Sequence, residues 1–346
     1  MAAEMLEASS AGFAAAANAE LQSRRSNPQK GDSTLWQAHL QQRVLELAAA
    51  LRVGEPKLFS SRIAWLRRAA AARSDDGSEI RLALESLQSA MQKELPDSLR
   101  NSVNAIVELA LREADHEVEP EALALDPKTT AGKLGLDYIA ACLDPERGDA
   151  AQLIIDAIDA GMKPEEIYCD VLLPVQKEVG QLWHVGEFSI AEERIVSETT
   201  RRVMSLIAAR FQPRETNGRT MLAASVAGNT HDIGLRTVSD LFALAGWRCL
   251  YLGANVPTAE IAGAVEDHAI DLVVLTATLT PQLNVLTNAI AEINRVAPET
   301  RVLVGGIAFE DSDELWKRVG ADGFARDIRD AVATGERLLE QPVTRD

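Results

Sequence analysis

The sequence is short of cysteine, of long apolar runs and of positive charge. Its three cysteines, Cys142, Cys169 and Cys249, are far apart and odd in number, so we expect buried free thiols rather than disulfides or a zinc cluster. Because no run of about 18 apolar residues and no secretory signal is present, we expect a soluble, cytoplasmic protein. Lys and Arg total 35 against 52 acidic residues, and the net charge of −17 repels phosphate backbones. We therefore expect no direct binding to nucleic acid.

Apolar residues make up 47% of the sequence, which is enough to form a buried core in each of several domains. Residues 1–34 mix small and polar side chains, and we expect a flexible tail there, with a fraying helix as the alternative. Apolar residues recur at helical spacing over residues 35–125, which predicts an amino-terminal helical region. A second helical stretch over residues 126–214 has turn signals that divide it into four helices, as in an antiparallel bundle.

The pattern changes over residues 215–346, where short apolar runs alternate with helical stretches. The expected strands are Met221–Val226, Cys249–Leu252, Leu272–Leu275, Val302–Val304 and a weaker one at Asp322–Ala325. Alternating strands and helices predict a Rossmann-like or flavodoxin-like, doubly wound parallel sheet of five strands. The fold class is therefore α plus α/β. Ligands on such sheets bind at the carboxyl ends of the strands.

Three loops with specific chemistry follow these strands. The first strand leads into Gly228 and then Asn229-Thr230-His231-Asp232-Ile233-Gly234. A single histidine in such a loop is more often a cap or a surface residue than a ligand. Here, however, the third strand ends in Thr276-Ala277-Thr278 and the fourth in Gly305-Gly306, so hydroxyl groups and paired glycines join His231 at one sheet edge. Small residues there leave room for a large ligand.

These loops resemble the cobalamin-binding domain of methionine synthase, corrinoid methyl carriers and B12 photoreceptors. That family carries Asp-x-His-x-x-Gly, then about 41 residues, Ser-x-Leu, about 26 to 28 residues, and Gly-Gly. In this chain 41 residues separate Gly234 from Thr276, and 26 separate Thr278 from Gly305. The resemblance implies that His231 replaces the dimethylbenzimidazole base as the lower axial ligand of cobalt. It also implies that the displaced nucleotide tail enters a slot beside Thr276 and Thr278, lined by Gly305 and Gly306.

The loops depart from the family pattern at two places. Asn229 stands where the family has Asp, and an amide fixes the histidine tautomer without raising the basicity of the ring as a carboxylate does. The His231–cobalt bond is therefore expected to be weaker in electron donation. Thr276 and Thr278 stand for Ser and Leu, which keeps a hydroxyl but adds polarity at the second position.

The second helical stretch contains a further match, Trp183 followed after nine residues by Glu193. Taken alone, Trp183 would be a core aromatic and Glu193-Arg194 a solvated helix face. The passage resembles the cap of light-sensing, adenosylcobalamin-dependent regulators of the CarH type. Those regulators have a histidine at the position that Arg194 occupies in this chain. The resemblance implies that Trp183 packs on the adenosyl group, that Glu193 hydrogen-bonds it, and that His184 takes the upper cobalt position after photolysis. A helix-surface role for His184 is the alternative.

The amino-terminal region lacks the DNA-binding domain of those regulators. This arrangement resembles the photocobilins, which hold a biliverdin beside the cobalamin, and Arg62, Arg67 and Arg68 could pair with bilin propionates. Arginines at such spacing are more often simply exposed. The cysteines have no bilin-attachment context, so any bilin is expected to be noncovalent.

The sequence favours a non-enzymatic sensor: an adenosylcobalamin photoreceptor whose photolysis changes the cap contacts and the oligomeric state, with output through a protein partner. A corrinoid methyl carrier, which would be a subunit of a methyltransferase enzyme, is the first alternative. A light-indifferent cobalamin-binding module is the second. The large Trp183 and the Asn229 substitution argue mildly against the methyl carrier.

Overall fold

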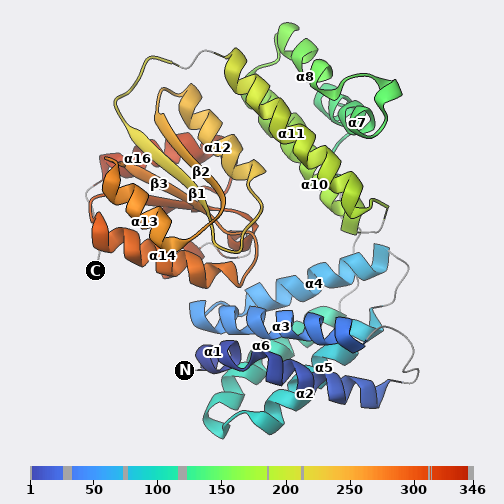
Figure 1. Ribbon diagram of the computed structural model, residues 1–346. Coiled ribbons are helices and arrows are strands. Elements are labelled where there is room, and N and C mark those ends of the chain that lie inside the picture. Colours follow the sequence, from blue (N-terminus) through green and yellow to red (C-terminus); the bar gives the residue numbers. More distant parts are fainter. Residues whose placement is uncertain are drawn as a thin grey trace. The chain divides into compact units, whose positions relative to one another are not determined.

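The chain forms two compact units in a computed structural model (Figure 1). The structure describes residues 2–25, 33–72, 77–115, 123–184, 187–211, 214–310, 312 and 314–341. One unit comprises residues 1–120, 277–287 and 307–319, and the other comprises residues 121–276, 288–306 and 320–346. Within the described residues, no helix is long and apolar enough to cross a membrane.

The first unit contains the amino-terminal helices (Figure 1, blue to teal). Its helices are α1 (Ala2–Ala8), α2 (Ser10–Arg24), α3 (Ser33–Val53), α4 (Lys57–Ala72), α5 (Ser78–Glu94) and α6 (Asp97–Asp115). It also includes the short helices η3 (Ile307–Phe309) and α15 (Leu315–Arg318). In this unit α2 packs on α5 and α3, and α4 packs on α6. Turn residues at positions 54–56 and 95–96 separate α3 from α4 and α5 from α6, because glycine and proline end helical hydrogen bonding there.

The expected flexible tail at residues 1–34 is wrong for the part that the structure describes. Helices α1 and α2 bury an apolar stripe that includes Leu6, Phe13 and Leu21, and α2 packs on both α3 and α5. Alanines at neighbouring helical positions let these helices approach closely, so few large side chains suffice to bury them. The part of the prediction that falls on residues 26–32 lies outside the described residues.

The second unit begins with a helical cap. Its elements are α7 (Thr130–Leu143), the 3-10 turn η1 (Pro145–Arg147), α8 (Ala150–Asp159), α9 (Pro164–Glu166), the π-helix η2 (Ile167–Leu172), α10 (Leu173–His184) and α11 (Ile190–Arg210). Because α9, η2 and α10 run on without a break, the cap is a four-helix bundle, as expected. Tyr138 and Tyr168 are fully buried in its core. The hydroxyl groups of Tyr138 and Thr200 are 3.1 Å apart across the bundle.

The rest of the second unit is built around a parallel sheet with strand order β2-β1-β3-β4-β5. The strands are β1 (Thr220–Val226), β2 (Arg248–Val256), β3 (Leu272–Thr276), β4 (Arg301–Gly305) and β5 (Gly323–Phe324). The sequence predicted a doubly wound parallel sheet of five strands, and the observed order is the flavodoxin-like one of the two that it left open. The chain reverses direction across the sheet between β1 and β3. Continuous apolar runs form β1, β3 and β4 because both faces of the sheet are covered.

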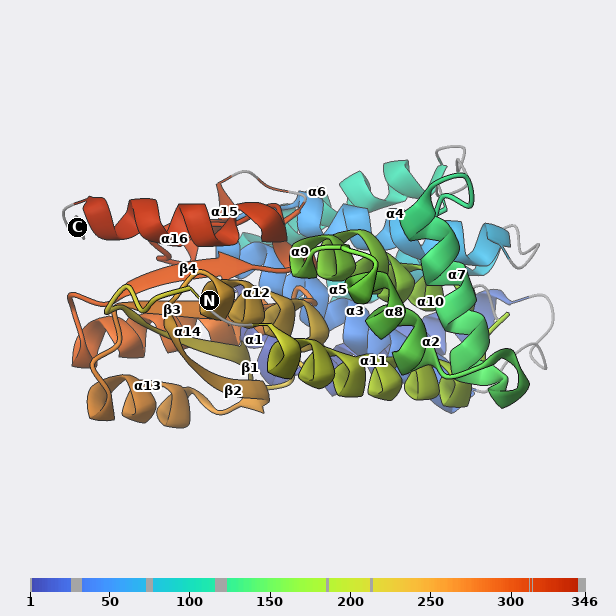
Figure 2. The ribbon, with the colours of Figure 1, turned by 90° about the horizontal axis from the view of Figure 1, so that it is seen from above.

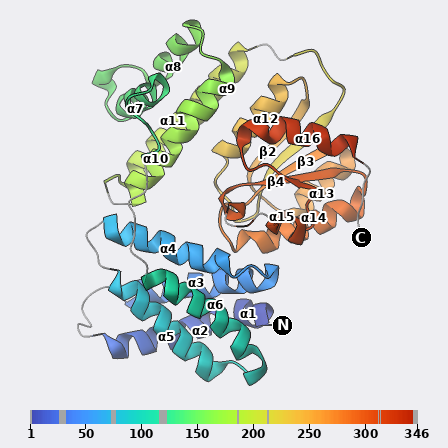
Figure 3. The ribbon, with the colours of Figure 1, turned by 180° about the vertical axis from the view of Figure 1, so that it is seen from behind.

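Helices cover the sheet on both faces, as Figures 2 and 3 show. The helices are α12 (Ile233–Leu244), α13 (Thr258–Asp267), α14 (Gln282–Val296) and α16 (Ala331–Glu340), the last preceded by the 3-10 turn η4 (Ile328–Asp330). Helices α12 and α16 share one face and pack on each other, while α13 and α14 lie on the opposite face. The loop after β1, which carries His231, and the carboxyl end of β3, which is Thr276, therefore meet at the switch point of the sheet.

The three cysteines are free thiols, as expected, but each is half-buried rather than fully buried. Burial raises the pKa of Cys142 and of Cys169 to about 11, and that of Cys249 to about 12. At neutral pH these groups are therefore protonated thiols with low nucleophilicity.

Replacing Gly246 with Ala is expected to destabilise the sheet domain by about 1–3 kcal/mol. Gly246 has a φ of 92° at the turn before β2, and a Cβ there would lie 2.3 Å from the Glu215 carbonyl oxygen. The matched control is Gly263→Ala in α13, where a Cβ meets nothing within 4 Å and alanine favours the helix by about 0.5–1 kcal/mol. Thermal unfolding midpoints should fall for Gly246→Ala and hold or rise for Gly263→Ala. Equal midpoints would contradict the strained turn.

Candidate functional site

The site starts from two hydroxyl groups at the ends of neighbouring strands. Ser225 in β1 and Thr276 in β3 are directly paired in the parallel ladder. Their hydroxyl oxygens are 2.9 Å apart, and the Ser225 hydroxyl also donates to the His231 carbonyl oxygen at 3.2 Å. Ser225 is fully buried. The strand register therefore holds the backbone of the histidine loop against the sheet edge.

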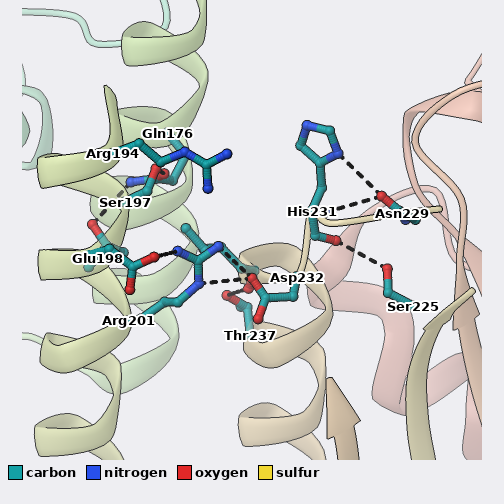
Figure 4. A network of polar contacts seen from close by, with 12 residues as sticks. Gln176, Arg194, Ser197, Glu198, Arg201, Ser225, Asn229, His231, Asp232 and Thr237 are labelled. Atoms are coloured by element: carbon teal, nitrogen blue, oxygen red, sulfur yellow. Dashed lines mark hydrogen bonds and ion pairs between the residues drawn. The ribbon is translucent and has the colours of Figure 1, made fainter. Parts of the chain in front are cut away.

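Asn229 is the fully buried centre of that loop. Its side-chain Nδ2 donates to the Thr276 carbonyl oxygen at 3.2 Å, which fixes the orientation of the amide. Its Oδ1 then faces His231, where it accepts from the backbone N–H at 3.2 Å and lies 3.2 Å from the ring nitrogen Nδ1 (Figure 4). Because an amide oxygen only accepts, Nδ1 carries the proton. The lone pair of His231 is therefore on Nε2, the nitrogen that is turned away from Asn229.

A second asparagine supports the loop from β2. Asn255 adopts the left-handed conformation with a φ of 56°. Its Oδ1 accepts from the Gly228 N–H at 2.7 Å, and its own N–H donates to the Asn229 carbonyl oxygen at 2.9 Å. Gly228 itself has a φ of 82°, a conformation that glycine adopts without strain. Two strands that flank β1 thus hold the loop, β2 through Asn255 and β3 through Thr276.

The His231 ring is exposed at the surface of this loop, whereas its neighbours Asn229 and Ile233 are buried. Protein atoms around the ring still restrict its hydration, and this desolvation lowers the pKa of His231 below its usual 6.5. The Arg194 guanidinium acts in the same direction, while the Glu193 carboxylate opposes it. The ring is therefore neutral at physiological pH, the form in which imidazole coordinates a metal.

Asp232 joins the loop to the cap. Its Oδ1 accepts from Arg201 Nε at 2.9 Å and from Arg201 Nη2 at 2.8 Å (Figure 4). Its Oδ2 accepts from the Tyr251 hydroxyl at 3.1 Å. Burial and the nearby Asp232 carboxylate raise the pKa of Tyr251, so the phenol stays a hydrogen-bond donor at neutral pH.

The cap residues singled out in the sequence lie on α10 and α11. Trp183 is 43% exposed, so it is not the core aromatic of the bundle. Glu193 accepts from the Ser197 hydroxyl at 2.8 Å and lies 3.6 Å from Arg194, whose side chain is largely exposed. His184 is the last residue of α10, and the position of its side chain lies outside the described residues.

The remaining expected residues belong to the loops after β3 and β4. Gly305 pairs with Thr276 in the ladder, and Gly306 has a φ of 106°. A Cβ on Gly305 would lie 3.6 Å from the Ala325 carbonyl oxygen. Thr278 is part of the first unit, where its N–H donates to Gln282 Oε1 at 2.8 Å. Gly305 thus adjoins Thr276 along the sheet edge.

Sequence reasoning missed Ser225, Asn255, Arg201 and Tyr251 as parts of this network. Ser225 could have been found as the polar residue within the apolar run of the first strand. Arg201 and Tyr251 gave no local signal because their partner, Asp232, is 31 and 19 residues away. Among the described residues, no group of three or more His, Cys, Asp or Glu side chains could hold a metal ion.

Replacing Asn229 with Asp is expected to raise the pKa of His231 in the ligand-free protein, because a carboxylate attracts the imidazolium. With its pKa below 6.5, wild-type His231 binds fewer protons when folded than when unfolded, so stability falls as the pH drops from 6.5 through the folded pKa. The variant should lose less stability over the same window. NMR titration of the ring, assigned with His231→Ala, measures the pKa. An unchanged value would contradict the Nδ1 hydrogen bond.

Comparison with known proteins identifies the two parts of the second unit. Residues 137–208 and residues 219–333 each match a family model described as B12 binding domain, and together they cover more than half of the chain. A corrinoid protein of Desulfitobacterium hafniense is 24% identical over 208 residues, which are 58% of this chain and 94% of that protein. The transcriptional repressor CarH of Myxococcus xanthus is 25% identical over 173 residues, which are 49% of this chain and 57% of that protein.

A solved structure has the same fold. The monomethylamine corrinoid protein of Methanosarcina barkeri superposes with a TM-score of 0.52 at 19% identity, over 60% of this chain and 98% of that protein. The helical cap and the five-stranded sheet are thus those of corrinoid proteins. Both a transcriptional repressor and a corrinoid protein are thus similar to this chain. The chain belongs to the B12-binding family, and it carries the paired cap and sheet domains of that family.

Proposed function

We propose that this cobalamin-binding protein is a light sensor that uses adenosylcobalamin, with His231 as the lower axial ligand of cobalt. The observation that carries the proposal is the orientation of His231. Its Nδ1 faces Asn229 Oδ1 at 3.2 Å, so Nε2 is the nitrogen available to a metal. The residues fit the cofactor because a single neutral imidazole, an ordered loop and small residues at Gly305 and Gly306 suit a corrinoid that brings its own metal.

The chain's residues hold the cofactor and orient the ligand. The cofactor supplies a cobalt–carbon bond that light can break. Asn229, Ser225 and Thr276 keep the His231 loop in place through the contacts at the switch point. The neighbouring loop residues Thr230, Asp232, Ile233 and Gly234 would complete the lower surface, and Thr276, Gly305 and Gly306 of the second unit would receive the nucleotide tail.

The proposal for the upper side rests on the cap. An exposed Trp183 provides a flat apolar surface of the kind on which an adenosyl group stacks. Glu193 and Arg194 act electrostatically on His231, so the same stretch of α11 that carries them lies close enough to influence the lower ligand. We assign Glu193 and Arg194 to the adenosyl side, and His184 as the imidazole that replaces the adenosyl group after illumination.

In this proposal the protein is a regulator rather than an enzyme. Loss of the adenosyl group would remove a contact of Trp183 and bias the cap toward a second position, which is a two-state element driven by a ligand event. Output would come from a change in oligomeric state or from a protein partner. The acidic net charge of −17 favours a protein partner over nucleic acid.

A biliverdin is proposed as a second, noncovalent chromophore in the amino-terminal helices. Arg62 lies over the Trp65 ring at 3.6 Å, and its Nε is 3.5 Å from the buried Glu46 carboxylate. Arg43 also pairs with Glu46 at 2.8 Å. These two arginines against one carboxylate leave a net positive charge among α3 and α4, which would attract propionates. We assign Arg62, Arg67 and Arg68 to this role.

The methyl-carrier alternative draws support from the corrinoid proteins that are similar to this chain. The corrinoid protein of Desulfitobacterium hafniense matches this chain over 94% of its length. A methyl carrier needs a cap that moves aside for large partners. Methyl transfer from the methylcobalamin-loaded protein to a thiol, in the presence of a partner methyltransferase, would favour that function.

Replacing His231 with Ala is expected to weaken cobalamin binding at least tenfold and to shift the corrin absorption bands, because the imidazole that coordinates cobalt is lost. His268→Ala is the matched control, since His268 is an exposed histidine at the end of α13. Titration with hydroxocobalamin followed by absorption measures both effects. If His231→Ala bound cobalamin with wild-type affinity and spectrum, the axial assignment would be wrong.

When the protein is loaded with adenosylcobalamin in the dark and then illuminated, its absorption spectrum and its molecular mass, measured by light scattering, are expected to change.

Added biliverdin should give a separate red absorption band, which Arg62→Ala should weaken. Trp183→Ala should accelerate loss of the adenosyl group without abolishing cobalamin binding, because the lower ligand is intact. If photolysis left the size and the partner affinity unchanged, the light-sensor proposal would be wrong. The protein would then be a light-indifferent cobalamin-binding module or a methyl carrier.

A further inference from the structure

A row of polar side chains joins the cap to the helix that follows His231. Asp232, Arg236 and Asp240 are four residues apart, so they lie on one face of α12. Their partners are cap residues: Arg201 and Ser205, four apart on α11, and Tyr168 in the π-helix η2. We call these three contacts the α12 seam. It is part of the second unit, in which both the cap and the sheet lie.

The three contacts of the α12 seam differ in their donor groups. The Tyr168 hydroxyl, on a fully buried residue, donates to Asp240 Oδ2 at 2.8 Å. Arg236 Nη2 donates to the Ser205 hydroxyl at 3.1 Å. Arg201 reaches Asp232 with two nitrogens, and solvent touches 25% of the arginine and 16% of the aspartate side chain. The acceptor carboxylates at the two ends are about equally exposed, since solvent reaches 17% of the Asp240 side chain. The ends therefore differ in the donor, which is a charged guanidinium next to His231 and a neutral phenol at the far end.

Asp232 connects three elements at the residue next to His231. Its carboxylate binds Arg201 of the cap and the Tyr251 hydroxyl of β2. Its carbonyl oxygen accepts from the Arg236 N–H at 2.8 Å, which closes the first turn of α12. The backbone on both sides of His231 is thus fixed, by Asn229 before it and by Asp232 after it.

We propose that Arg201 is a positioning residue, which couples the position of the cap to that of His231 through Asp232. The proposal rests on the role of His231 as the cobalt ligand and goes beyond it. When the cap moves away, Arg201 leaves Asp232, and the loop loses the charged contact next to His231. The Tyr168–Asp240 contact keeps the far end of α12 attached. Binding at His231 and closure of the cap therefore favour each other, which is a reciprocal coupling.

The physical basis is the charge of the contact. Two N–H groups on one carboxylate oxygen make a charge-assisted hydrogen bond, which is stronger than a neutral one. Removing Arg201 leaves Asp232 partly buried with the Tyr251 hydroxyl as its remaining side-chain donor among the contacts described above. Water then competes for the carboxylate, and the first turn of α12 loosens.

The experiment compares Arg201→Ala with Arg210→Ala in the full chain without ligand. Arg210 lies on the same helix and pairs with Asp159 of the cap at 2.6 Å, so its loss removes an ion pair that does not involve the histidine loop. Hydrogen exchange at the amides of Asn229, His231 and Arg236 should quicken roughly tenfold in Arg201→Ala and stay unchanged in Arg210→Ala. Amides of the core strand β3 should exchange at the wild-type rate in both variants.

A second measurement uses hydroxocobalamin as the probe. Arg201→Ala and Asp232→Asn should each raise its dissociation rate by about tenfold, and the double variant should be no worse than either single one, because both remove the same contact. Additive effects would overturn the coupling. So would loop exchange that is equal in the two arginine variants, or that rises equally in β3.

The proposed function fails in a different way. If His231 were not the cobalt ligand, His231→Ala would bind hydroxocobalamin like wild type, while the exchange result in the ligand-free protein would still report on Arg201. If His231→Ala loses binding but Arg201→Ala behaves as Arg210→Ala does, the function stands and the positioning role of Arg201 is wrong.

Discussion

The orientation of one buried amide, that of Asn229, decides what the site can do. Its Nδ2 is committed to the Thr276 carbonyl oxygen, so its Oδ1 must face the Nδ1 of His231. A buried amide that turned over would place two donors or two acceptors against each other, at a cost of about 1–3 kcal/mol for each unsatisfied group. The histidine therefore has a single tautomer. That tautomer leaves Nε2 for a metal, and the neutral amide leaves the ring less basic than a carboxylate would.

The sheet makes this arrangement possible because β1 and β3 are neighbours although β2 lies between them in the chain. The crossover places Ser225 opposite Thr276 and brings Asn255 to the other side of the same loop. Three strand ends thus fix one histidine. The cap adds a fourth point through Arg201 and Asp232, so the histidine loop is in direct contact with the cap. In the proposed function this contact would link the lower ligand to the element that covers the opposite side of the cofactor. Light sensing and methyl transfer both require a cap that moves, and the α12 seam is where such movement would reach His231.

Much of the fold could be predicted from the sequence. The amino-terminal region after residue 33 is helical and the cap is a four-helix bundle, as the sequence predicted, and each of the five strands overlaps the range predicted for it. The prediction of a flexible tail was wrong because α1 and α2 bury only three large apolar side chains, together with three alanines and two polar residues. Such a composition gives a weak periodic signal in the sequence. Strand β2 extends to Val256, beyond the predicted end, because Gly253 and Asn255 adopt positive φ values without ending the ladder. The pattern of apolar residues does not indicate such irregular pairing between strands.

The sequence by itself determined the identity of the histidine loop, its spacing to Thr276 and Gly305, and hence the B12-binding family. Those features are local or lie at fixed intervals along the chain, so they can be recognised without knowledge of the tertiary contacts. Only the tertiary structure decided the tautomer of His231, the partners of Ser225 and Asn255, and the contact between Arg201 and Asp232. Each of these depends on atoms that are distant in the sequence and are brought within hydrogen-bonding distance by sheet register and helix packing. Hydrogen bonds act over about 3 Å, and the sequence alone does not fix distances on that scale.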